Sequence, residues 1–252
     1  LTTSSGNYAQ AVAYAASILG IQSTIVMTED TNSYKVERTR TLGAKVEFCG
    51  PRFEDRFQRL EEIKKETGAL VLHGFDSIET IQGNASIAYE LMDHFEGPLS
   101  VISPASGGGL ISGIATTLKE SRANCEVFGC QPQQGAAIFE SLKKGRRTNV
   151  GKIETFADAL VASIPGERTF SIIQNYVDDF VTCSEEEIKN WVLDCFENEK
   201  LVIEGGAATS IAAILSKKIN VRNENVVCIL SGGNISIQKF AQLVTQKHLM
   251  VQ

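Results

Sequence analysis

The chain has 252 residues, of which 43% are hydrophobic, 21% charged and 7% aromatic, and its formal net charge is −6. This apolar content is that of a globular protein, which excludes a disordered chain, and the length suits one large domain or two modest ones. The mild acidity and the lack of a long basic run argue against nucleic acid as a partner. Every apolar run is far shorter than the ~20 residues that span a bilayer, so we expect no membrane partner.

The cysteine usage indicates a reducing compartment, and we expect a cytoplasmic protein. The six cysteines are Cys49, Cys125, Cys130, Cys183, Cys195 and Cys228. None belongs to a C-x-x-C pair, which argues against a zinc ribbon or a thioredoxin-type site. Three of them stand in apolar runs, where a free cysteine behaves as a small hydrophobic residue.

Short apolar runs alternate with helical patterns along the whole chain. Strands are predicted at residues 23–27, 44–49, 69–73, 99–104, 125–130, 179–183 and 226–230. Helices are predicted at residues 9–19, 34–42, 53–67, 79–94, 110–121, 185–199 and 207–219. Nearly continuous apolar strands between helices predict an α/β fold with two lobes, each an open, mostly parallel sheet flanked by helices. We expect a small lobe over residues 1–76 and a large lobe over residues 77–252.

Three loops rich in Gly, Ser and Asn follow strands or open helices, where ligands bind in such folds. They read T-S-S-G-N-Y-A-Q at residues 3–10, S-P-A-S-G-G-G-L at residues 103–110 and L-S-G-G-N at residues 230–234. Read alone, the first is a helix N-cap and the third a turn. The second suits a phosphate, because glycine amides and a helix N-terminus approach an anion closely. Its alternative is a plain strand-to-helix turn.

A nicotinamide dinucleotide is another alternative for the second loop. The spacing from Gly107 and Gly109 to Gly113 is G-x-G-x-x-x-G, one residue longer than the dinucleotide fingerprint. A dinucleotide-binding oxidoreductase would also leave the other two loops unexplained.

Together, S-S-G-N-x-x-Q, S-G-G-G-L and S-G-G-N resemble the loops of fold type II pyridoxal-phosphate enzymes, in the serine racemase and serine/threonine dehydratase family. E-G-G-A-A at residues 204–208 and I-E-T-F-A-D at residues 153–158 are similar to two further segments of that family. The resemblance implies a tryptophan synthase beta-like fold, pyridoxal 5'-phosphate as cofactor, a small amino-acid substrate and a homodimer. It implies racemisation of serine, or elimination of water from serine or threonine to give a keto acid and ammonia.

The resemblance assigns most cofactor contacts to the large lobe. The residues that match the phosphate loop are Ser106, Gly107, Gly108, Gly109 and Leu110. Ser231 matches the serine that faces the pyridine nitrogen, and Asn7 matches the asparagine beside the 3-hydroxyl. Because a hydroxyl supplies no charge to the ring, the resemblance implies a weaker electron sink, suited to elimination of a β-substituent rather than to transamination.

The resemblance also assigns substrate contacts. Ser4, Ser5, Asn7 and Tyr8 match the cradle for the substrate carboxylate, although the family usually has His where Tyr8 stands. Ser5 is the candidate catalytic residue, because a serine there in racemases lies opposite the Schiff-base lysine and racemisation needs an acid/base group on each face. Its alternative is a plain N-cap serine. Arg56 matches a substrate-facing arginine of serine racemases, and its alternative is an exposed helix charge.

Two departures from the family pattern concern a metal and a methyl group. The family's divalent-cation site has a Glu and an Asp where this chain has Gln131 and Ala137. Neutral side chains do not hold Mg²⁺ or Ca²⁺, so we expect no metal there. Ala159 stands where the family often has Gly, and we expect its methyl group to crowd the cofactor or substrate.

The last departure concerns the Schiff-base lysine. In the family it lies in a Ser-Phe-Lys or Asn-Phe-Lys motif upstream of S-S-G-N. Neither motif occurs in the 252 residues, and the chain opens at Leu1 just before that loop. We therefore expect a fragment that lacks the N-terminal part of the large lobe and has little activity alone. The alternative is a catalytically impaired paralogue that binds an amino acid.

Overall fold

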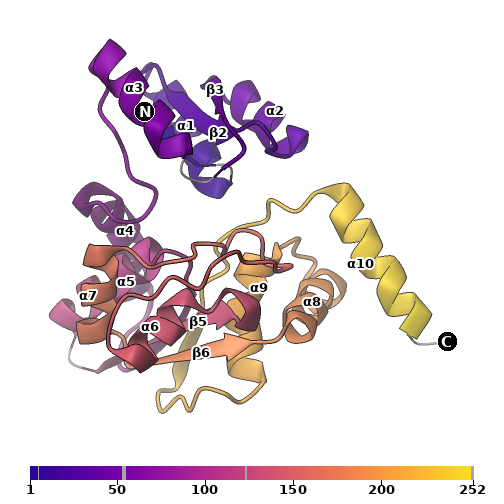
Figure 1. The fold of residues 1–252 in the computed structure, drawn as a ribbon. Coiled ribbons are helices and arrows are strands. Elements are labelled where there is room, and N and C mark those ends of the chain that lie inside the picture. Colours follow the sequence, from indigo (N-terminus) through magenta and orange to yellow (C-terminus); the bar gives the residue numbers. More distant parts are fainter. Residues whose placement is uncertain (5, 53–54, 123, 251–252) are drawn as a thin grey trace. The chain divides into compact units, whose positions relative to one another are not determined.

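The computed structural model describes residues 1–4, 6–52, 55–122 and 124–250 (Figure 1). The chain divides into two compact units, Leu1–Ser77 and Ile78–Gln252. Each unit contains a parallel sheet flanked by helices, which confirms the predicted fold class. Within the described residues, none of the helices combines the length and the apolar character that crossing a membrane requires.

The first unit is built on a three-stranded parallel sheet. Its strands are β1 (Thr2–Thr3), β2 (Thr24–Thr28) and β3 (Lys45–Cys49), in the order β1-β2-β3. The central strand carries Ile25, Val26 and Met27, none of which has any exposed surface. This burial accounts for the apolar run that predicted the strand.

Helices of the first unit cover both faces of this sheet. They are α1 (Asn7–Ile18), α2 (Ser33–Thr41) and α3 (Asp55–Thr67). Side chains alternate along a strand, so Ile25 and Met27 pack in a cluster with α1 and α2, whereas Val26 packs in another cluster with α3. Each buried aliphatic side chain contributes roughly 1.5–3 kcal/mol. A shift of one residue would exchange the two faces, so this alternation fixes the register of β2.

The strand predicted at residues 69–73 is wrong. The segment instead runs beside the start of the chain, where the amino group of Leu1 donates to the carbonyl of Leu70 at 2.9 Å. The amide of Leu72 donates to the carbonyl of Leu1 at 2.9 Å, and the hydroxyl of Thr2 donates to the carbonyl of Leu72 at 2.6 Å. The apolar pattern of the segment reflects its packing against the cluster around α3.

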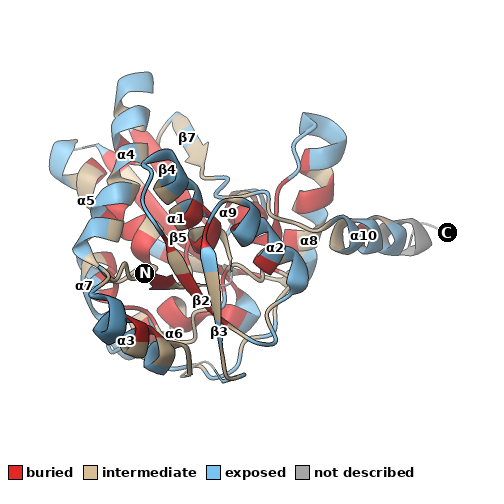
Figure 2. Cartoon of the chain, turned by 90° about the horizontal axis from the view of Figure 1, so that it is seen from above, coloured by how far each residue is buried: buried red, intermediate tan, exposed pale blue. Residues whose placement is uncertain are grey.

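The second unit contains a four-stranded parallel sheet. Its strands are β4 (Leu99–Pro104), β5 (Cys125–Pro132), β6 (Asp179–Cys183) and β7 (Asn225–Cys228), in the order β6-β5-β4-β7. Every residue of β4 is buried, as its position between two neighbours and two helical layers requires. Figure 2 shows that buried residues gather in the strands and on the helix faces that cover them.

Two helical layers cover this larger sheet. The helices are α4 (Ile78–His94), α5 (Gly109–Ser121), α6 (Ala137–Lys144), α7 (Glu167–Tyr176), α8 (Glu185–Asp194), α9 (Gly205–Leu215) and α10 (Ile237–Met250). Val101 of β4 packs with α4, α5 and α7, whereas the next residue, Ile102, packs with α8 and α9. Helices α6, α7 and α10 were not among the predicted helices. The helix predicted over residues 185–199 is α-helical only to Asp194 and continues as a π-helical turn, Cys195–Glu199.

Candidate active site

Two of the three glycine-rich loops leave the large sheet at the same edge. β4 and β7 are adjacent and parallel, with Ile102 opposite Cys228, and the amide of Ile229 donates to the carbonyl of Ile102 at 2.9 Å. The carboxyl ends of both strands therefore lie at one edge, and residues 103–110 and 230–234 follow them. In open parallel sheets, this is the edge at which ligands bind.

The loop at residues 103–110 leads directly into α5. The amide of Ala105 donates to the carbonyl of Cys130 at 3.0 Å, which keeps the start of the loop attached to β5. Gly108 is the N-cap of α5 and has a φ of 102°, a conformation that favours glycine. A Cβ atom at Gly108 would also lie 2.9 Å from Cδ1 of Ile173 and 2.9 Å from Cβ of Thr169. Because the first-turn amides of a helix have no partner within it, this turn is suited to an anion.

Ser106 connects this loop to the stretch of chain that follows the I-E-T-F-A-D segment. Its hydroxyl accepts a hydrogen bond from the amide of Ala162 at 3.1 Å. Ala162 follows the I-E-T-F-A-D segment, which Glu185 holds in place by accepting bonds from the hydroxyl of Thr155 and the amide of Phe156, both at 2.7 Å. Sequence analysis missed Glu185, because a lone glutamate at a helix start signals only a favourable helix terminus.

The loop at residues 230–234 is joined to the start of α9. The carbonyl of Gly232 accepts a bond from the amide of Glu204 at 3.1 Å. A Cβ atom at Gly233 would lie 2.7 Å from the carbonyl oxygen of Val202, so the close approach of the two segments requires glycine. Ser231 is exposed, which leaves its side chain accessible to a ligand at this edge.

The glycines of E-G-G-A-A allow the I-E-T-F-A-D segment to approach α9. A Cβ atom at Gly205 would lie 2.8 Å from Cδ1 of Phe156 and 3.0 Å from Cα of Ala157. One at Gly206 would lie 3.3 Å from Cβ of Ala159, so Ala159 packs against this first turn of α9. The two segments that resemble the family are therefore neighbours, and residues 103–110 join them through Ser106.

The predicted substrate residues belong to the first unit. Ser4, Asn7 and Tyr8 lie between β1 and the first turn of α1, and the hydroxyl of Ser4 accepts a bond from the amide of Gly6 at 3.3 Å. Gly6 is the N-cap of α1 and has no side chain to offer the helix amides, an arrangement suited to a carboxylate. Ser5, the candidate catalytic residue, lies outside the described residues.

Arg56 lies in the first turn of α3 and is half-buried rather than fully exposed. Burial raises the pKa of the nearby Cys49 thiol, and the positive charge of Arg56 partly opposes this rise. The guanidinium therefore lies close enough to Cys49, at the carboxyl end of β3, to influence its thiol electrostatically.

Comparison with known proteins decides the family. The family described as "Pyridoxal-phosphate dependent enzyme" matches residues 1–232. The chain belongs to this family.

Curated relatives of this chain include threonine ammonia-lyases and dehydratases. It is 35% identical to an L-threonine ammonia-lyase of Geobacter sulfurreducens over 244 residues, which are 97% of this chain and 61% of that protein. It is 36% identical to L-threonine dehydratase catabolic TdcB of Staphylococcus aureus over 247 residues, which are 97% of this chain and 71% of that protein. The chain thus spans about 61% of the length of the first of these curated relatives.

The chain is also similar in fold and sequence to solved structures of serine racemases. Maize serine racemase is 30% identical, with a TM-score of 0.91, over 99% of this chain and 77% of that one. A serine racemase from Dictyostelium discoideum is 32% identical, with a TM-score of 0.87, over 94% of this chain and 77% of that one.

The residues at the edge of the large sheet fit a pyridoxal-phosphate cofactor. Residues 103–110 offer glycine amides and the positive end of α5, and residues 230–234 offer the accessible Ser231 at the same edge. Neither loop contains an acidic side chain that would repel a phosphate. Neither Ser-Phe-Lys nor Asn-Phe-Lys, the motifs in which the resemblance places the Schiff-base lysine, occurs in the 252 residues.

Gln131 lies near the end of β5 and Ala137 is the first residue of α6, and these are the two positions at which the resemblance implies a cation site. Gln131 is fully buried, and its Oε1 accepts bonds from the amide of Ile138 at 3.0 Å and the amide of Phe139 at 3.2 Å. The side-chain oxygen of Gln131 is therefore already hydrogen-bonded to two amides in the first turn of α6. Across the described ranges, no group of three or more His, Cys, Asp or Glu side chains is placed to hold a metal ion.

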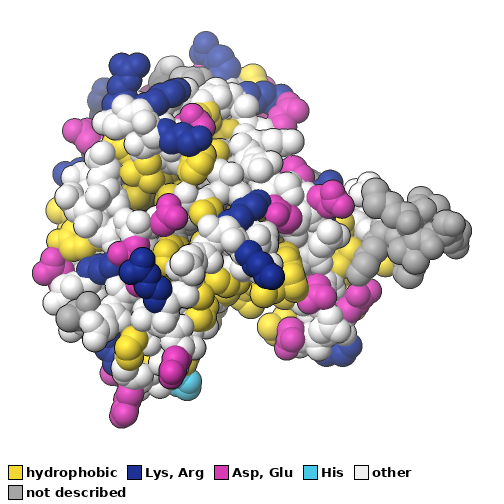
Figure 3. Space-filling model, turned by 90° about the horizontal axis from the view of Figure 1, so that it is seen from below, with side chains coloured by type: hydrophobic (Ala, Val, Ile, Leu, Met, Phe, Trp, Pro, Cys, Tyr) yellow, Lys and Arg dark blue, Asp and Glu magenta, His cyan; other side chains and the backbone are white. Residues whose placement is uncertain are grey.

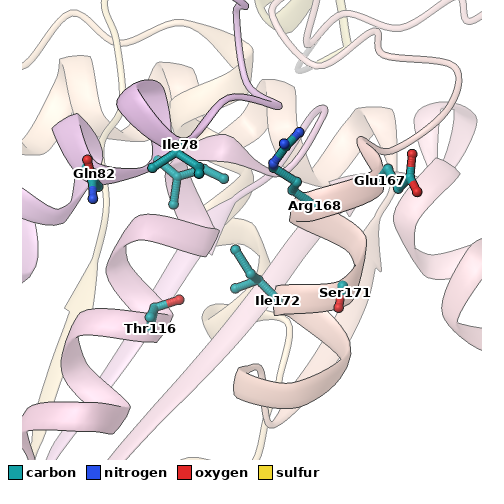
Figure 4. Close-up of a pocket in the computed structure, with 8 residues that line it drawn as sticks. Ile78, Gln82, Thr116, Glu167, Arg168, Ser171 and Ile172 are labelled. Carbon is teal, nitrogen blue, oxygen red and sulfur yellow. The ribbon is translucent and has the colours of Figure 1, made fainter.

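A pocket of the second unit lies away from the assigned residues. It has a volume of about 710 Å³ and is lined by Ile78, Ile81, Gln82, Thr116, Glu167, Arg168, Ser171 and Ile172. Figure 4 shows these side chains on α4, α5 and α7. None of the residues assigned to the cofactor lines it, so we place the site at the carboxyl edge of the sheet.

The cysteines are free thiols that are buried or half-buried. All six cysteines are free, and burial raises the pKa of Cys183 to about 12 and that of Cys228 to about 11. These two thiols stay protonated at neutral pH and are poor nucleophiles. On the face drawn in Figure 3, Lys and Arg side chains are interspersed with Asp and Glu.

Proposed function

We propose that this chain forms the cofactor and substrate site of a pyridoxal-phosphate enzyme acting on serine or threonine. The reaction is the interconversion of L- and D-serine, or the elimination of water to give a keto acid and ammonia, or both. The observation that carries the proposal is the meeting of the glycine loop and the Ser231 loop at one edge of the sheet, in a family whose relatives include threonine ammonia-lyases and serine racemases. We further propose a cytoplasmic homodimer.

Each assigned residue has a role in binding. The amides of residues 106–110 would hold the cofactor phosphate, Ser231 would bind the pyridine nitrogen, and Asn7 would interact with the 3-hydroxyl. Bound pyridoxal phosphate supplies an electron sink that makes the α-proton of an amino acid acidic. Ser4, Tyr8 and the amides at the start of α1 bind the substrate carboxylate, and Arg56 faces the substrate.

Ser5 supplies the acid/base group on one face of the substrate. Removal of the α-proton from one face and its return from the other inverts the configuration at Cα, so two groups are required. The Ser5 hydroxyl is one of them. When the β-hydroxyl leaves instead, the products are a keto acid and ammonia, and that outcome does not need Ser5.

The test separates the two outcomes. The purified chain is incubated with pyridoxal phosphate and L-serine, with and without methylamine as a replacement for the missing lysine amine, and D-serine and pyruvate are both measured. We expect Ser5→Ala to lower D-serine formation by about 100-fold while pyruvate formation persists. Ser86→Ala, at an exposed position on α4, is the control. Unchanged D-serine formation in Ser5→Ala would show that the role of Ser5 is wrong.

A second candidate function is amino-acid binding without turnover. The absent lysine motif, the neutral pair Gln131 and Ala137, and the methyl group of Ala159 favour it. This candidate predicts that L-serine binds in calorimetry but yields no keto acid, even with methylamine. Reading the coding sequence upstream of Leu1 discriminates further, because a Ser-Phe-Lys or Asn-Phe-Lys motif there would favour the enzyme.

A further inference from the structure

The glycine loop is fixed by a helix that the sequence did not predict. In the first turn of α7, Thr169 is fully buried, and its hydroxyl donates a 2.6 Å hydrogen bond to the carbonyl of Gly107. The amide of Gly166, the N-cap of α7, donates to the same carbonyl at 3.2 Å. Both oxygen lone pairs of Gly107 are thus directed toward the start of α7.

The same threonine also packs against the next residue of the loop. A Cβ atom at Gly108 would lie 2.9 Å from Cβ and 3.0 Å from Oγ1 of Thr169. The side chain of Thr169 therefore meets the loop both through its hydroxyl and through its carbon atoms. It holds the position of the loop and the rotation of the peptide unit between Gly107 and Gly108.

The orientation of that peptide unit determines what the loop offers to a ligand. In a trans peptide, the carbonyl and the following amide point in opposite directions. The structure contains no cis peptide among the described residues. Because the Gly107 carbonyl points toward α7, the amide of Gly108 points away from α7. If the carbonyl were released, the unit could rotate and present its oxygen to an anion instead.

We propose that Thr169 is a positioning residue that keeps the Gly108 amide available to the cofactor phosphate. This inference rests on the proposed function, because it takes residues 106–110 as the phosphate site. Thr169 itself touches the loop and not the cofactor. Its effect should therefore depend on whether the ligand carries a phosphate.

The experiment compares two ligands and three variants of the full chain. Dissociation constants for pyridoxal 5'-phosphate and for pyridoxal, which has no phosphate, are measured by equilibrium dialysis. Thr169→Val keeps the shape and removes the hydroxyl, whereas Thr169→Ser keeps the hydroxyl. Thr39→Val is the control, since Thr39 is also buried and its hydroxyl also bonds a backbone carbonyl, that of Lys35 on α2.

We expect Thr169→Val to weaken binding of pyridoxal 5'-phosphate by about three- to tenfold, as the loss of one buried hydrogen bond suggests. Binding of pyridoxal should stay within about twofold, and Thr169→Ser and Thr39→Val should bind both ligands like the unsubstituted chain. Equal weakening for both ligands, or no weakening in a folded Thr169→Val, would overturn the role of Thr169 alone. If the unsubstituted chain showed no preference for the phosphorylated ligand, the proposed function would fail and this inference with it.

Discussion

Glu185, at the start of α8, holds the backbone of Phe156, which lies 29 positions earlier in the chain. Its carboxylate, in the first residue of α8, accepts a 2.7 Å bond from the Phe156 amide and another from the hydroxyl of Thr155. Lys239 of α10 donates to the carbonyl of Phe156 at 2.7 Å, so both polar groups of that residue are held by side chains. Side chains of α8 and α10 thus hold a segment that has no regular secondary structure.

We therefore predict that Glu185→Ala lowers the free energy of unfolding by about 1–3 kcal/mol, since two bonds to a charged group are lost. Urea unfolding followed by circular dichroism measures the change. The control is Glu186→Ala, because Glu186 is the next residue in the same helix turn and is exposed. Equal loss of stability in the two variants would contradict a specific role for Glu185.

A glycine can be required by its backbone conformation or by a lack of space for a Cβ atom, and Gly108 and Gly145 allow these two requirements to be compared. Both have a positive φ, 102° and 64°, but a Cβ at Gly108 meets Thr169 and Ile173, whereas one at Gly145 has open space. Gly145→Ala should cost about 1 kcal/mol, from the backbone conformation alone. Gly108→Ala should cost about 1–3 kcal/mol more, because the packing must also shift.

Thermal unfolding of both alanine variants tests this difference. If Gly108→Ala were as stable as Gly145→Ala, the shift of α7 away from the loop would cost no free energy, and the prediction would be contradicted. Phosphate-dependent ligand binding should be lost only in Gly108→Ala, since Gly145 ends α6 and lies outside the glycine loop.

The sequence was informative where periodicity and loop chemistry agree. The strands at residues 99–104 and 179–183 have the predicted bounds, because the apolar runs end at the residues where the chain leaves the sheet. The segment at residues 69–73 is also apolar, yet it bonds to the first residues of the chain and forms no strand. Its pairing depends on the tertiary structure, which composition alone does not predict. Helices such as α7 were missed because they are short and each buries only a few residues, Thr169, Phe170 and Ile173 in this case.

In the candidate site, too, some residues could be predicted from the sequence and others could not. The glycine loops were visible because glycine at several neighbouring positions is rare outside turns and anion sites. The residues that hold those loops, Thr169 and Glu185, were invisible, because each is a single common residue whose partner lies 62 or about 30 positions away. Sequence patterns therefore predict which loops bind a ligand, whereas the structure shows which residues keep these loops in place.

Gln131 leads to a prediction about calcium. Its Oε1 caps α6, and its Nε2 is buried without a hydrogen-bond partner among the described residues. We expect calcium chloride to leave the thermal midpoint of the unsubstituted chain unchanged, because neutral groups bind Ca²⁺ weakly. The double variant Gln131→Glu and Ala137→Asp supplies two carboxylates and should gain a saturable rise of about 2–5 °C.

Differential scanning fluorimetry with calcium and with magnesium measures this effect. Gln131→Glu alone and Ala137→Asp alone serve as controls, because one added carboxylate should bind the ion less strongly than two. A saturable rise in the unsubstituted chain would contradict the prediction that it holds no cation at this position.

We predict that His73 makes the stability of the first unit depend on pH. Its Nδ1 accepts bonds from the amide of Phe75 at 3.3 Å and the amide of Asp76 at 2.9 Å. An acceptor nitrogen carries no proton, so the turn requires the neutral ring. Burial lowers the pKa of His73 below its ordinary value of 6.5, and the nearby Asp76 carboxylate opposes this only in part.

The sign of the pH effect follows from that lowered pKa. As the pH falls below about 6.5, the unfolded chain takes up a proton at His73 before the folded chain does, so stability is lost. Above that pH both forms are neutral and the stabilisation is complete. His73→Asn should remove this part of the pH dependence, because the asparagine Oδ1 takes the place of Nδ1 and does not titrate.

Urea unfolding between about pH 7 and pH 5 measures the slope, since histidine titrates in this range. His73→Gln is the matched comparison, because its longer side chain places the oxygen away from both amides and should lower stability at every pH. His94→Asn, at an exposed position at the end of α4, should leave the slope unchanged. If His73→Asn kept the slope of the unsubstituted chain, the dependence would come from the carboxylates and the turn would not be sensitive to His73.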